Sequence, residues 1–365
     1  MIIKVAYISS RRHTGAGEGG IMPKPTVHDI SVHSGLSTAT VDRVLNDRSG
    51  VSQRARDKVA TAVRELGYGK LPESLSVEVR SRLRFLFLLP TRRSGFVRSL
   101  EIAIQNAPSA VTDISIEPVI QKISLDSLDG GQDLIASLDA ISLDDFQGVA
   151  LFALDTPGVK QAIKRAIDRG ISVVTLVSDV AGATPHFIGI DNVSAGRMAG
   201  KLVGKYTGRQ TGTIGLLVGS IALRDHLDRM FGFQQVIGTS FPNLKILPVY
   251  EGNSDPETNK TIVTKMLQDH PDLLGLYSAG AGNVGVLDAL SSVAPDPRPV
   301  VIMHELTPRV RDALSREEID VVLSQDTDHI ARSAVRILRA LCFDLDIIPT
   351  QEKIRIDVFM ADNLP

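Results

Sequence analysis

Residues 26–68 read TVHDISVHSGLSTATVDRVLNDRSGVSQRARDKVATAVRELGY, and this stretch decides the fold of the N-terminal part of the chain. Thr26 and Asp29 have the spacing of a capping box, in which each side chain accepts a backbone N–H of the other residue at a helix start. Gly35 can adopt the left-handed conformation that ends such a helix. Ser37 is a good N-cap for the next helix. The stretch therefore predicts two short helices joined by a glycine-containing turn.

The second of these helices has one apolar face, formed by Val41, Val44 and Leu45. Its opposite face is small or polar and is expected to be exposed. That face carries Ala39, Asp42, Arg43 and Asn46. A third helix, from Ser52 to Gly67, repeats apolar residues at helical spacing and braces the first two. Residues 22–68 are therefore expected to form a helix-turn-helix domain.

The charge is distributed unevenly along the chain. Residues 1–84 carry 14 Lys and Arg against 8 Asp and Glu, a net charge of +6, whereas the remaining residues carry 26 against 34, a net charge of −8. A basic N-terminal piece on an acidic body indicates that the N-terminus approaches a polyanion such as nucleic acid. Ordinary scatter of surface charge is the alternative explanation.

Length and composition indicate a globular protein with several domains. A chain of 365 residues exceeds the roughly 250–300 residues at which one hydrophobic core stops growing. Its 43% hydrophobic and 22% charged residues exclude disorder for the bulk of the chain. No apolar run approaches the ~18 residues of a membrane span, and the first residues lack the apolar region of a signal peptide. We therefore expect a cytoplasmic protein with no membrane partner.

Two minor features complete the outline. Residues 1–21 contain the Gly-rich run GAGEGG and are expected to be a disordered extension or a misassigned start ahead of Met22. The single cysteine, Cys342, lies in an apolar helical run and is expected to fill the core. It can form no internal disulfide and no cysteine cluster for a metal.

Beyond a polar hinge linker at residues 69–84, strand-like apolar runs alternate with helical stretches. Eight such runs are FLFLL (85–89), GVALFAL (148–154), ISVVTLV (171–177), HFIGI (186–190), TIGLLVG (213–219), LLGLYSA (273–279), PVVIMH (299–304) and DVVLS (320–324). This alternation is typical of α/β proteins whose parallel sheets are covered on both faces. Because one twisted sheet rarely exceeds about ten strands, we expect two doubly wound subdomains.

Polar side chains follow most of these apolar runs. In open α/β sheets, ligands bind outside the carboxyl ends of the strands. The residues expected to line such a cleft are Asp155, Asp179, Arg229, Asn283, Glu305 and Gln325, with Phe96 covering an apolar ligand face. Carboxylates, amides and a guanidinium can pair with vicinal hydroxyls, so a sugar site is favoured. The alternative is that each Asp or Asn only caps the following helix.

One motif points to a different ligand. Residues 280–285, GAGNVG, match the dinucleotide fingerprint G-x-G-x-x-G, and Glu305 ends the next strand, where a ribose-binding acid would lie. A chance match is common in a chain with 30 glycines. No metal-ligand spacing, P-loop lysine or hydrolytic triad is found, and His304 beside Glu305 is isolated. We therefore expect no cofactor and no enzyme, with an NAD(H)-sensing regulator or an α/β enzyme as the alternative.

Taken together, the chain resembles the LacI/GalR family of bacterial transcription regulators. Residues 26–68 resemble that family's DNA-binding headpiece, and LVSD, GIDNVSAG, DRMFGF and HELTP occur in the order of its effector-binding core. The resemblance covers about residues 24–360 and implies a core of type I periplasmic-binding-protein fold. It places DNA contacts at Ser37, Thr38, Ala39, Thr40, Arg43 and Asn46, and effector contacts at Phe96, Asp179, Arg229, Asn283, Glu305 and Gln325.

The resemblance also implies an organisation and a function. The core at 85–365 is expected to divide into an N-subdomain (about 85–207 and 326–353) and a C-subdomain (about 208–325 and 354–365). A repressor-type regulator is expected, which binds double-stranded operator DNA as a homodimer and responds to a small neutral sugar or polyol. A transport binding protein is disfavoured by the attached helix-turn-helix and the missing signal.

The sequence departs from the family pattern at two places. The family's hinge helix carries Ala-x-x-Leu, whereas residues 74–77 read SLSV here and are flanked by Glu73 and Glu78. Val77 thus stands where the family has the leucine that inserts into the minor groove, which argues against the same insertion here. Asp42 on the recognition helix would repel phosphates unless it accepts a hydrogen bond from a cytosine amino group or faces the protein.

Overall fold

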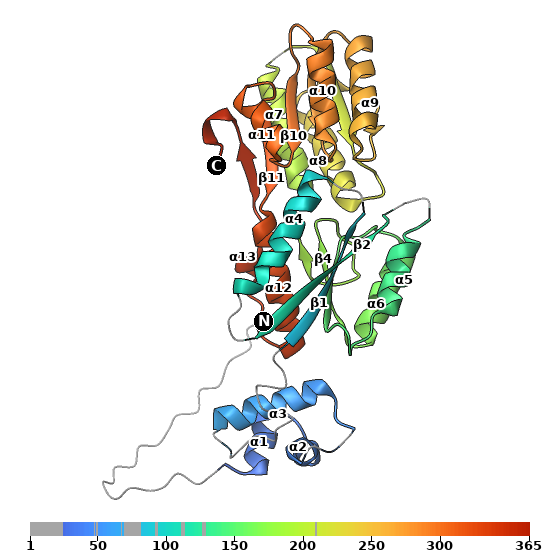
Figure 1. Cartoon of the computed structure of the whole chain (residues 1–365). Coiled ribbons are helices and arrows are strands. Elements are labelled where there is room, and N and C mark those ends of the chain that lie inside the picture. Colours follow the sequence, from blue (N-terminus) through green and yellow to red (C-terminus); the bar gives the residue numbers. More distant parts are fainter. Residues whose placement is uncertain are drawn as a thin grey trace, which may run out of the picture. The chain divides into compact units, whose positions relative to one another are not determined.

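The computed structural model describes residues 25–46, 48, 50–66, 68, 82–91, 94–110, 114–125, 129–208 and 210–365. The chain divides into two compact units, Met1–Val79 and Arg80–Pro365, which are called here the headpiece and the core. The expectations for residues 1–21 and for most of the hinge linker, including residues 73–78, lie outside the described residues. Figure 1 shows the elements of both units.

The headpiece contains the three expected helices. They are α1 (Val27–Ser34), α2 (Thr38–Leu45) and α3 (Gln53–Leu66). Thr26 and Asp29 form the capping box, Gly35 is left-handed with φ 67°, and the Ser37 hydroxyl caps α2 by accepting the Thr40 N–H. The helices bury a common apolar cluster of Ile30, Val41, Val44, Val59, Ala62 and Val63. The helix-turn-helix prediction is therefore confirmed, because these caps and one shared apolar face determine where each helix begins and packs.

The first sheet of the core is entirely parallel, with strand order β2-β1-β3-β4-β5. Its strands are β1 (Arg82–Pro90), β2 (Ser115–Ile123), β3 (Gly148–Leu151), β4 (Ser172–Leu176) and β5 (Phe187–Ile188). Its helices are α4 (Gly95–Asn106), the 3-10 turn η2 (Ala107–Ala110), α5 (Gln132–Ala140), α6 (Pro157–Asp168) and α12 (Thr327–Phe343). Phe85 and Phe87 face α4 and α12, whereas Leu86 and Leu88 face α5 and α6. The FLFLL run is continuous because both faces of its strand are covered.

The second sheet has strand order β12-β11-β10-β9-β6-β7, and β8 pairs with β6. Its strands are β6 (Gly212–Val218), β7 (Leu244–Ile246), β8 (Tyr250–Glu251), β9 (Leu273–Ser278), β10 (Val300–His304), β11 (Val321–Gln325) and β12 (Ile356–Phe359). Helices α7 (Asn192–Tyr206) and α8 (Arg224–Ser240) cover one face; α9 (Pro256–Asp269), α10 (Asn283–Val293) and α11 (Pro308–Ser315) cover the other. Only the edge strand β12 is antiparallel among the paired strands described. The α/β prediction with two doubly wound sheets is confirmed.

The chain crosses between the two subdomains after β5, after β11 and after the short helix α13 (Pro349–Glu352). Helix α7 packs closely on α8 in the second subdomain, so the first crossing lies near residue 191 and not at the expected boundary of 207. Glycines make this packing possible: a Cβ at Gly196 would collide with the carbonyl oxygen of Arg229, and one at Gly232 with that of Val193. The crossings place the carboxyl ends of both sheets around one cleft.

Candidate functional site

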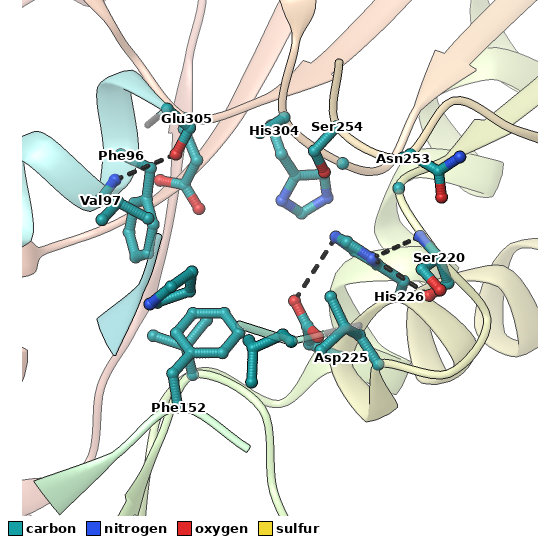
Figure 2. Close-up of a pocket in the computed structure, with 18 of the residues that line it drawn as sticks. Phe96, Val97, Phe152, Ser220, Asp225, His226, Asn253, Ser254, His304 and Glu305 are labelled. Atoms are coloured by element: carbon teal, nitrogen blue, oxygen red, sulfur yellow. Dashed lines mark hydrogen bonds and ion pairs between the residues drawn. The ribbon is translucent and has the colours of Figure 1, made fainter. Parts of the chain in front are cut away.

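A cavity of about 770 Å³ lies between the two subdomains of the core. It is lined by residues at the carboxyl ends of strands in both sheets and at the starts of α4 and α8, as the close-up in Figure 2 shows. The cavity lies at the edge where ligands bind in open α/β sheets. Its size is within the range typical of sites for small molecules.

Four of the seven side chains expected in the cleft line this cavity: Phe96, Arg229, Glu305 and Gln325. Phe96 belongs to α4 of the first subdomain, whereas Arg229 and Glu305 belong to the second. Gln325 ends β11, where the chain returns to the first subdomain. The cavity thus receives predicted residues from both sides of the cleft.

The other three expected residues do not line the cavity. Asp155, after β3 of the first subdomain, has its carboxylate 3.5 Å from the guanidinium of Arg224, on α8 of the second. Asp179 accepts hydrogen bonds from the Thr175 hydroxyl and the Val180 N–H, both at 2.8 Å, and borders a smaller neighbouring hollow. For these positions the expectation of a cleft contact was wrong, because a strand end determines the edge of the sheet but not the direction of the side chain.

Asn283 is buried beneath the cavity wall. Its amide accepts the Ser278 hydroxyl at 2.7 Å and donates to the carbonyl oxygen of His304 at 2.8 Å. Both ends of the amide are therefore occupied within the protein. Asn283 therefore supports the strand that carries His304 and does not line the cavity.

Asp225 is the carboxylate that the sequence reasoning missed. It lines the cavity and is 3% exposed. It precedes Arg229 by one helical turn, so its Oδ2 lies 3.9 Å from the guanidinium, which also donates to Asn192 Oδ1 at 2.8 Å and to the Ala279 carbonyl at 3.0 Å. The i, i+4 spacing of Asp225 and Arg229 is a signal that could have identified it.

Two buried histidines, also missed, face the same space (Figure 2). His226 Nδ1 lies 3.0 Å from the Ser220 nitrogen and 3.2 Å from the Ser220 carbonyl oxygen, and its Nε2 lies 3.7 Å from Asp225 Oδ2. His304 Nε2 lies 2.7 Å from the Tyr277 hydroxyl. Burial lowers the pKa of both imidazoles, and that of His304 falls well below its usual value. Both histidines are therefore neutral near pH 7.

Glu305 is held in an unusual conformation. Its φ is 68°, and its carboxylate accepts the Gln325 amide at 2.9 Å and the Ser324 hydroxyl at 3.2 Å. Burial raises the pKa of this carboxyl. Val177, at the end of β4 on the opposite wall, also has a positive φ of 63°. Each such non-glycine residue costs about 1–3 kcal/mol, and strained positions of this kind cluster at functional sites.

The two walls of the cavity differ in character. The wall from the first subdomain is mainly apolar and includes Pro90, Phe96, Val97, Phe152 and Val177. On the other wall, three lining residues each have a buried polar atom with no hydrogen-bond partner in the structure. These atoms are Asp225 Oδ1, His304 Nδ1 and Gln325 Oε1. Since buried polar atoms are normally paired, they mark positions where a bound molecule would complete the hydrogen bonding.

Two glycines of the motif at 280–285 pack against other segments of the protein. A Cβ at Gly282 would meet Ser254 and Asn259, and one at Gly285 would collide with the Pro256 carbonyl oxygen. These two glycines therefore allow α10 to approach α9 and the loop before it. The first residues of the motif, Gly280 and Ala281, line the cavity instead.

The headpiece presents a second candidate surface on α2. Ser37, Thr38, Ala39, Arg43 and Asn46 are exposed, and Thr40 is half-buried. The Ser37 and Thr40 hydroxyls hydrogen-bond to each other at 2.8 Å at the start of the helix. The expected DNA-contacting side chains thus lie along one accessible side of α2, opposite Val41 and Val44 in the headpiece core.

The described part of the chain lacks two kinds of feature. No helix there is long and apolar enough to span a bilayer. No group of three or more His, Cys, Asp or Glu side chains in that part is arranged to hold a metal ion. Cys342 is largely buried beside Ser172 and the Gln147 carbonyl, in agreement with a packing role.

Comparison with known proteins identifies both units. Residues 87–344 match the model of the periplasmic binding protein domain, and residues 26–70 match the model of bacterial regulatory proteins of the lacI family. The ribose operon repressor of Halalkalibacterium halodurans is 31% identical over 84 residues, or 23% of this chain and 25% of that protein. The transcriptional repressor CytR of Escherichia coli is 32% identical over 85 residues, or 22% and 25%. The aligned segments thus span about a quarter of each relative.

Solved structures resemble the core. A glucose-galactose binding protein from Geobacillus stearothermophilus has a TM-score of 0.67 at 17% identity, covering 78% of this chain and 99% of that one. A solute binding protein from Agrobacterium vitis, solved with bound D-fucose, has a TM-score of 0.68 at 17% identity, covering 77% and 96%. At these identities the likeness shows the fold. The matches of the headpiece model and of the curated relatives point to a transcription regulator and not to an enzyme. The core of the chain therefore belongs to the periplasmic binding protein domain family, and its headpiece is a DNA-binding domain of the kind found in bacterial regulatory proteins of the lacI family.

Proposed function

We propose that this protein is a cytoplasmic transcription repressor whose affinity for operator DNA is controlled by a small, neutral, polyhydroxylated molecule bound in the core cavity. Two kinds of relatives support the proposal. Segments of about 85 residues are 31–32% identical to the ribose operon repressor and CytR, and the core resembles proteins whose names include glucose, galactose and arabinose. The finer assignment of the effector rests on the cavity itself.

The observation that carries the effector assignment is the set of unpartnered atoms on the polar wall. Asp225 Oδ1 and Gln325 Oε1 can only accept hydrogen bonds, and His304 Nδ1 can accept one when Nε2 carries the proton. A buried polar atom left unpaired costs about 1–3 kcal/mol. A ligand that offers several hydroxyl donors would remove this cost at each atom. The phenyl rings of Phe96 and Phe152 on the other wall suit the C–H face of a sugar ring or polyol.

The charge of the cavity favours a neutral ligand over a phosphorylated one. Among the described lining residues, the cation is Arg229, and Asp225 and Glu305 are the carboxylates. Both histidines are neutral, because burial lowers their pKa. Arg229 already donates to Asn192 and Ala279, so the cavity offers no surplus cation for a phosphate group.

The mechanism proposed for control is a population shift. A ligand that contacts Phe96 on one subdomain and Asp225 on the other would stabilise one closure angle of the core. Because an effector moves an equilibrium only through different affinities for the two states, this contact on both walls is the source of the coupling. In a homodimer, a change of closure would alter the spacing of the two headpieces on a near-palindromic operator.

For the headpiece, we propose that Ser37, Thr38, Ala39, Thr40, Arg43 and Asn46 contact the operator. The dimer is tested by comparing residues 22–84 with the full chain at one salt concentration. Linking two headpieces raises the effective concentration of the second, so the full chain should bind its operator far more tightly. Equal affinities would refute the dimer.

The effector is tested by a thermal-shift screen of sugars, polyols, their phosphates, nucleosides and NAD(H) on the full chain. A ligand at 100 times its Kd stabilises the native state by about 2.7 kcal/mol, so a specific hit gives a clear rise in Tm. The expected hit is a neutral polyol whose effect is lost in Glu305→Gln. If a phosphorylated sugar or NADH stabilises the chain more than every neutral compound, the assignment is wrong.

A further inference from the structure

We propose that Asp42 determines which bases the headpiece reads, by fixing the orientation of the Asn46 side-chain amide. The inference rests on the proposed DNA binding by α2. Asp42 lies on the exposed side of this helix, where an uncompensated carboxylate would repel DNA. In the structure it is instead engaged by Asn46, which caps the C-terminus of the same helix, and by Arg48 in the following loop.

The contacts with Asn46 use both of its amide hydrogens. Asn46 Nδ2 donates to Asp42 Oδ1 at 2.8 Å and to the Asp42 backbone carbonyl at 2.9 Å. Within the described residues, no donor lies within hydrogen-bonding distance of Asn46 Oδ1. The amide is thus held with its nitrogen inward, and the exposed side chain of Asn46 offers its oxygen to a partner outside the headpiece.

The second carboxylate oxygen of Asp42 forms an ion pair with Arg48. Asp42 Oδ2 lies 3.5 Å from the Arg48 guanidinium. The backbone of Arg48 is held in turn, because its N–H donates to the Arg43 carbonyl at 2.8 Å and its carbonyl accepts from Arg56 at 3.0 Å. Asp42 therefore joins the end of α2 to the following loop while its negative charge is balanced.

This orientation has a consequence for base recognition. A free asparagine reads adenine with two bonds, accepting from N6 and donating to N7. With Nδ2 occupied, Asn46 can only accept, and the major-groove edge offers donors on adenine N6 and cytosine N4. Guanine O6 and thymine O4 present acceptors at these places. Position 46 should therefore select an amino-bearing base, adenine or cytosine, and reject guanine and thymine.

The test uses the full chain and a randomised DNA library. Selection with the wild-type chain defines the operator, and the affinity is then measured for all four bases at each position. The wild type should have one position at which adenine and cytosine bind on the order of tenfold more tightly than guanine and thymine. Asn46→Ala should abolish this preference at that position only.

Two variants of Asp42 distinguish the effect of the Asn46 amide orientation from the effect of the Asp42 charge. Asp42→Ala removes the side-chain acceptor and frees one Nδ2 hydrogen of Asn46, while the bond to the backbone carbonyl of residue 42 remains, so cytosine should lose its advantage while adenine keeps it. Asp42→Asn retains an oxygen that can accept from Asn46, so the preference for adenine and cytosine should return, although the charge on Arg48 is no longer balanced. The salt slope of this variant should be steeper by about one, because one further cation becomes available to a phosphate.

Glu65→Ala is the matched control. It removes a carboxylate of the same charge from α3, where Glu65 pairs with His33, and should leave every base preference unchanged. Circular dichroism verifies that each headpiece variant is folded. If Asp42→Ala keeps the wild-type base preferences while Asn46→Ala changes them, the role of Asp42 is refuted. If the wild-type chain selects no sequence at all, the proposed function fails instead.

Discussion

Replacing Arg229 by methionine should destabilise the core strongly, even though Arg229 also belongs to the proposed effector site. The guanidinium is 3% exposed and donates to Asn192 Oδ1 and to the Ala279 carbonyl. It is also the nearest cation to the buried carboxylate of Asp225, at 3.9 Å. Removing one partner of a buried pair leaves an uncompensated charge, which costs about 3–5 kcal/mol.

A double-mutant cycle separates the contribution of the Arg229–Asp225 pair from the rest of this loss of stability. Asp225→Asn removes the charge that Arg229 compensates, so the double variant should be less destabilised than the sum of the two single variants. For residues in direct interaction, the coupling is about 0.5–3 kcal/mol. We expect the upper half of this range, because both side chains are buried and Asp225 Oδ1 has no hydrogen-bond partner in the structure.

The assay is urea unfolding of the full chain, followed by far-ultraviolet circular dichroism because the sequence contains no tryptophan. The free energy of the core transition is compared among wild type, Arg229→Met, Asp225→Asn and the double variant. Lys265→Met, at an exposed ion pair with Asp269, is the control and should change stability by less than about 1 kcal/mol. A loss below about 1 kcal/mol for Arg229→Met, or strict additivity in the cycle, would refute the reasoning.

Three further predictions follow from single contacts. Burial lowers the pKa of His226 and His304 below the usual 6.5, so the folded chain binds fewer protons than the unfolded chain once the pH falls below 6.5. The free energy of unfolding should therefore be highest above pH 6.5 and fall below it. Urea unfolding between pH 7.5 and 5.5 should show a loss of up to about 1.4 kcal/mol per pH unit for each histidine, and His226→Gln should reduce this slope. Gly196→Ala should lower Tm markedly, because the new methyl group would collide with the Arg229 carbonyl; Gly238→Ala, which meets no atom within 4 Å, should not. Arg43→Ala should weaken operator binding by about 1–3 kcal/mol and relax the preference at one base pair, whereas an equal loss on all sequences would make Arg43 a phosphate contact only.

Local signals in the sequence were sufficient for the headpiece. The Thr26–Asp29 capping box, Gly35 and the Ser37 cap each act within a few residues, so their effects can be predicted without tertiary contacts. The strands of the core could be predicted for a similar reason, because a strand covered on both faces must be apolar throughout. The alternation of Phe and Leu in β1 then follows from two different helical layers.

The interior of the cleft required information that the sequence does not contain. After β4, the positive φ of Val177 turns the chain, so that Val177 lines the cavity and Asp179, two residues later, bonds to Thr175 instead. Similarly, the place of α7 depends on how closely Gly196 lets it approach α8. Both outcomes arise from packing between segments far apart in the chain, which strand and helix patterns do not reveal.

The same limit explains why Asp225, His226 and His304 were missed. Their side chains converge from α8 and β10, and only the fold shows that they share one cavity. By contrast, Glu305 and Gln325 end their strands directly, so the strand-end rule was sufficient for them.

The central claim is that a polyhydroxylated molecule in the cavity controls DNA binding. The most direct measurement is the affinity of the full chain for its selected operator, with and without a saturating amount of the neutral polyol that most raises Tm. Allosteric coupling of about 1–3 kcal/mol predicts a change in Kd of about 5- to 150-fold. In Glu305→Gln the operator affinity without polyol should be preserved and the change lost. Identical operator affinities with and without polyol, in a wild-type chain that the polyol stabilises, would contradict the account.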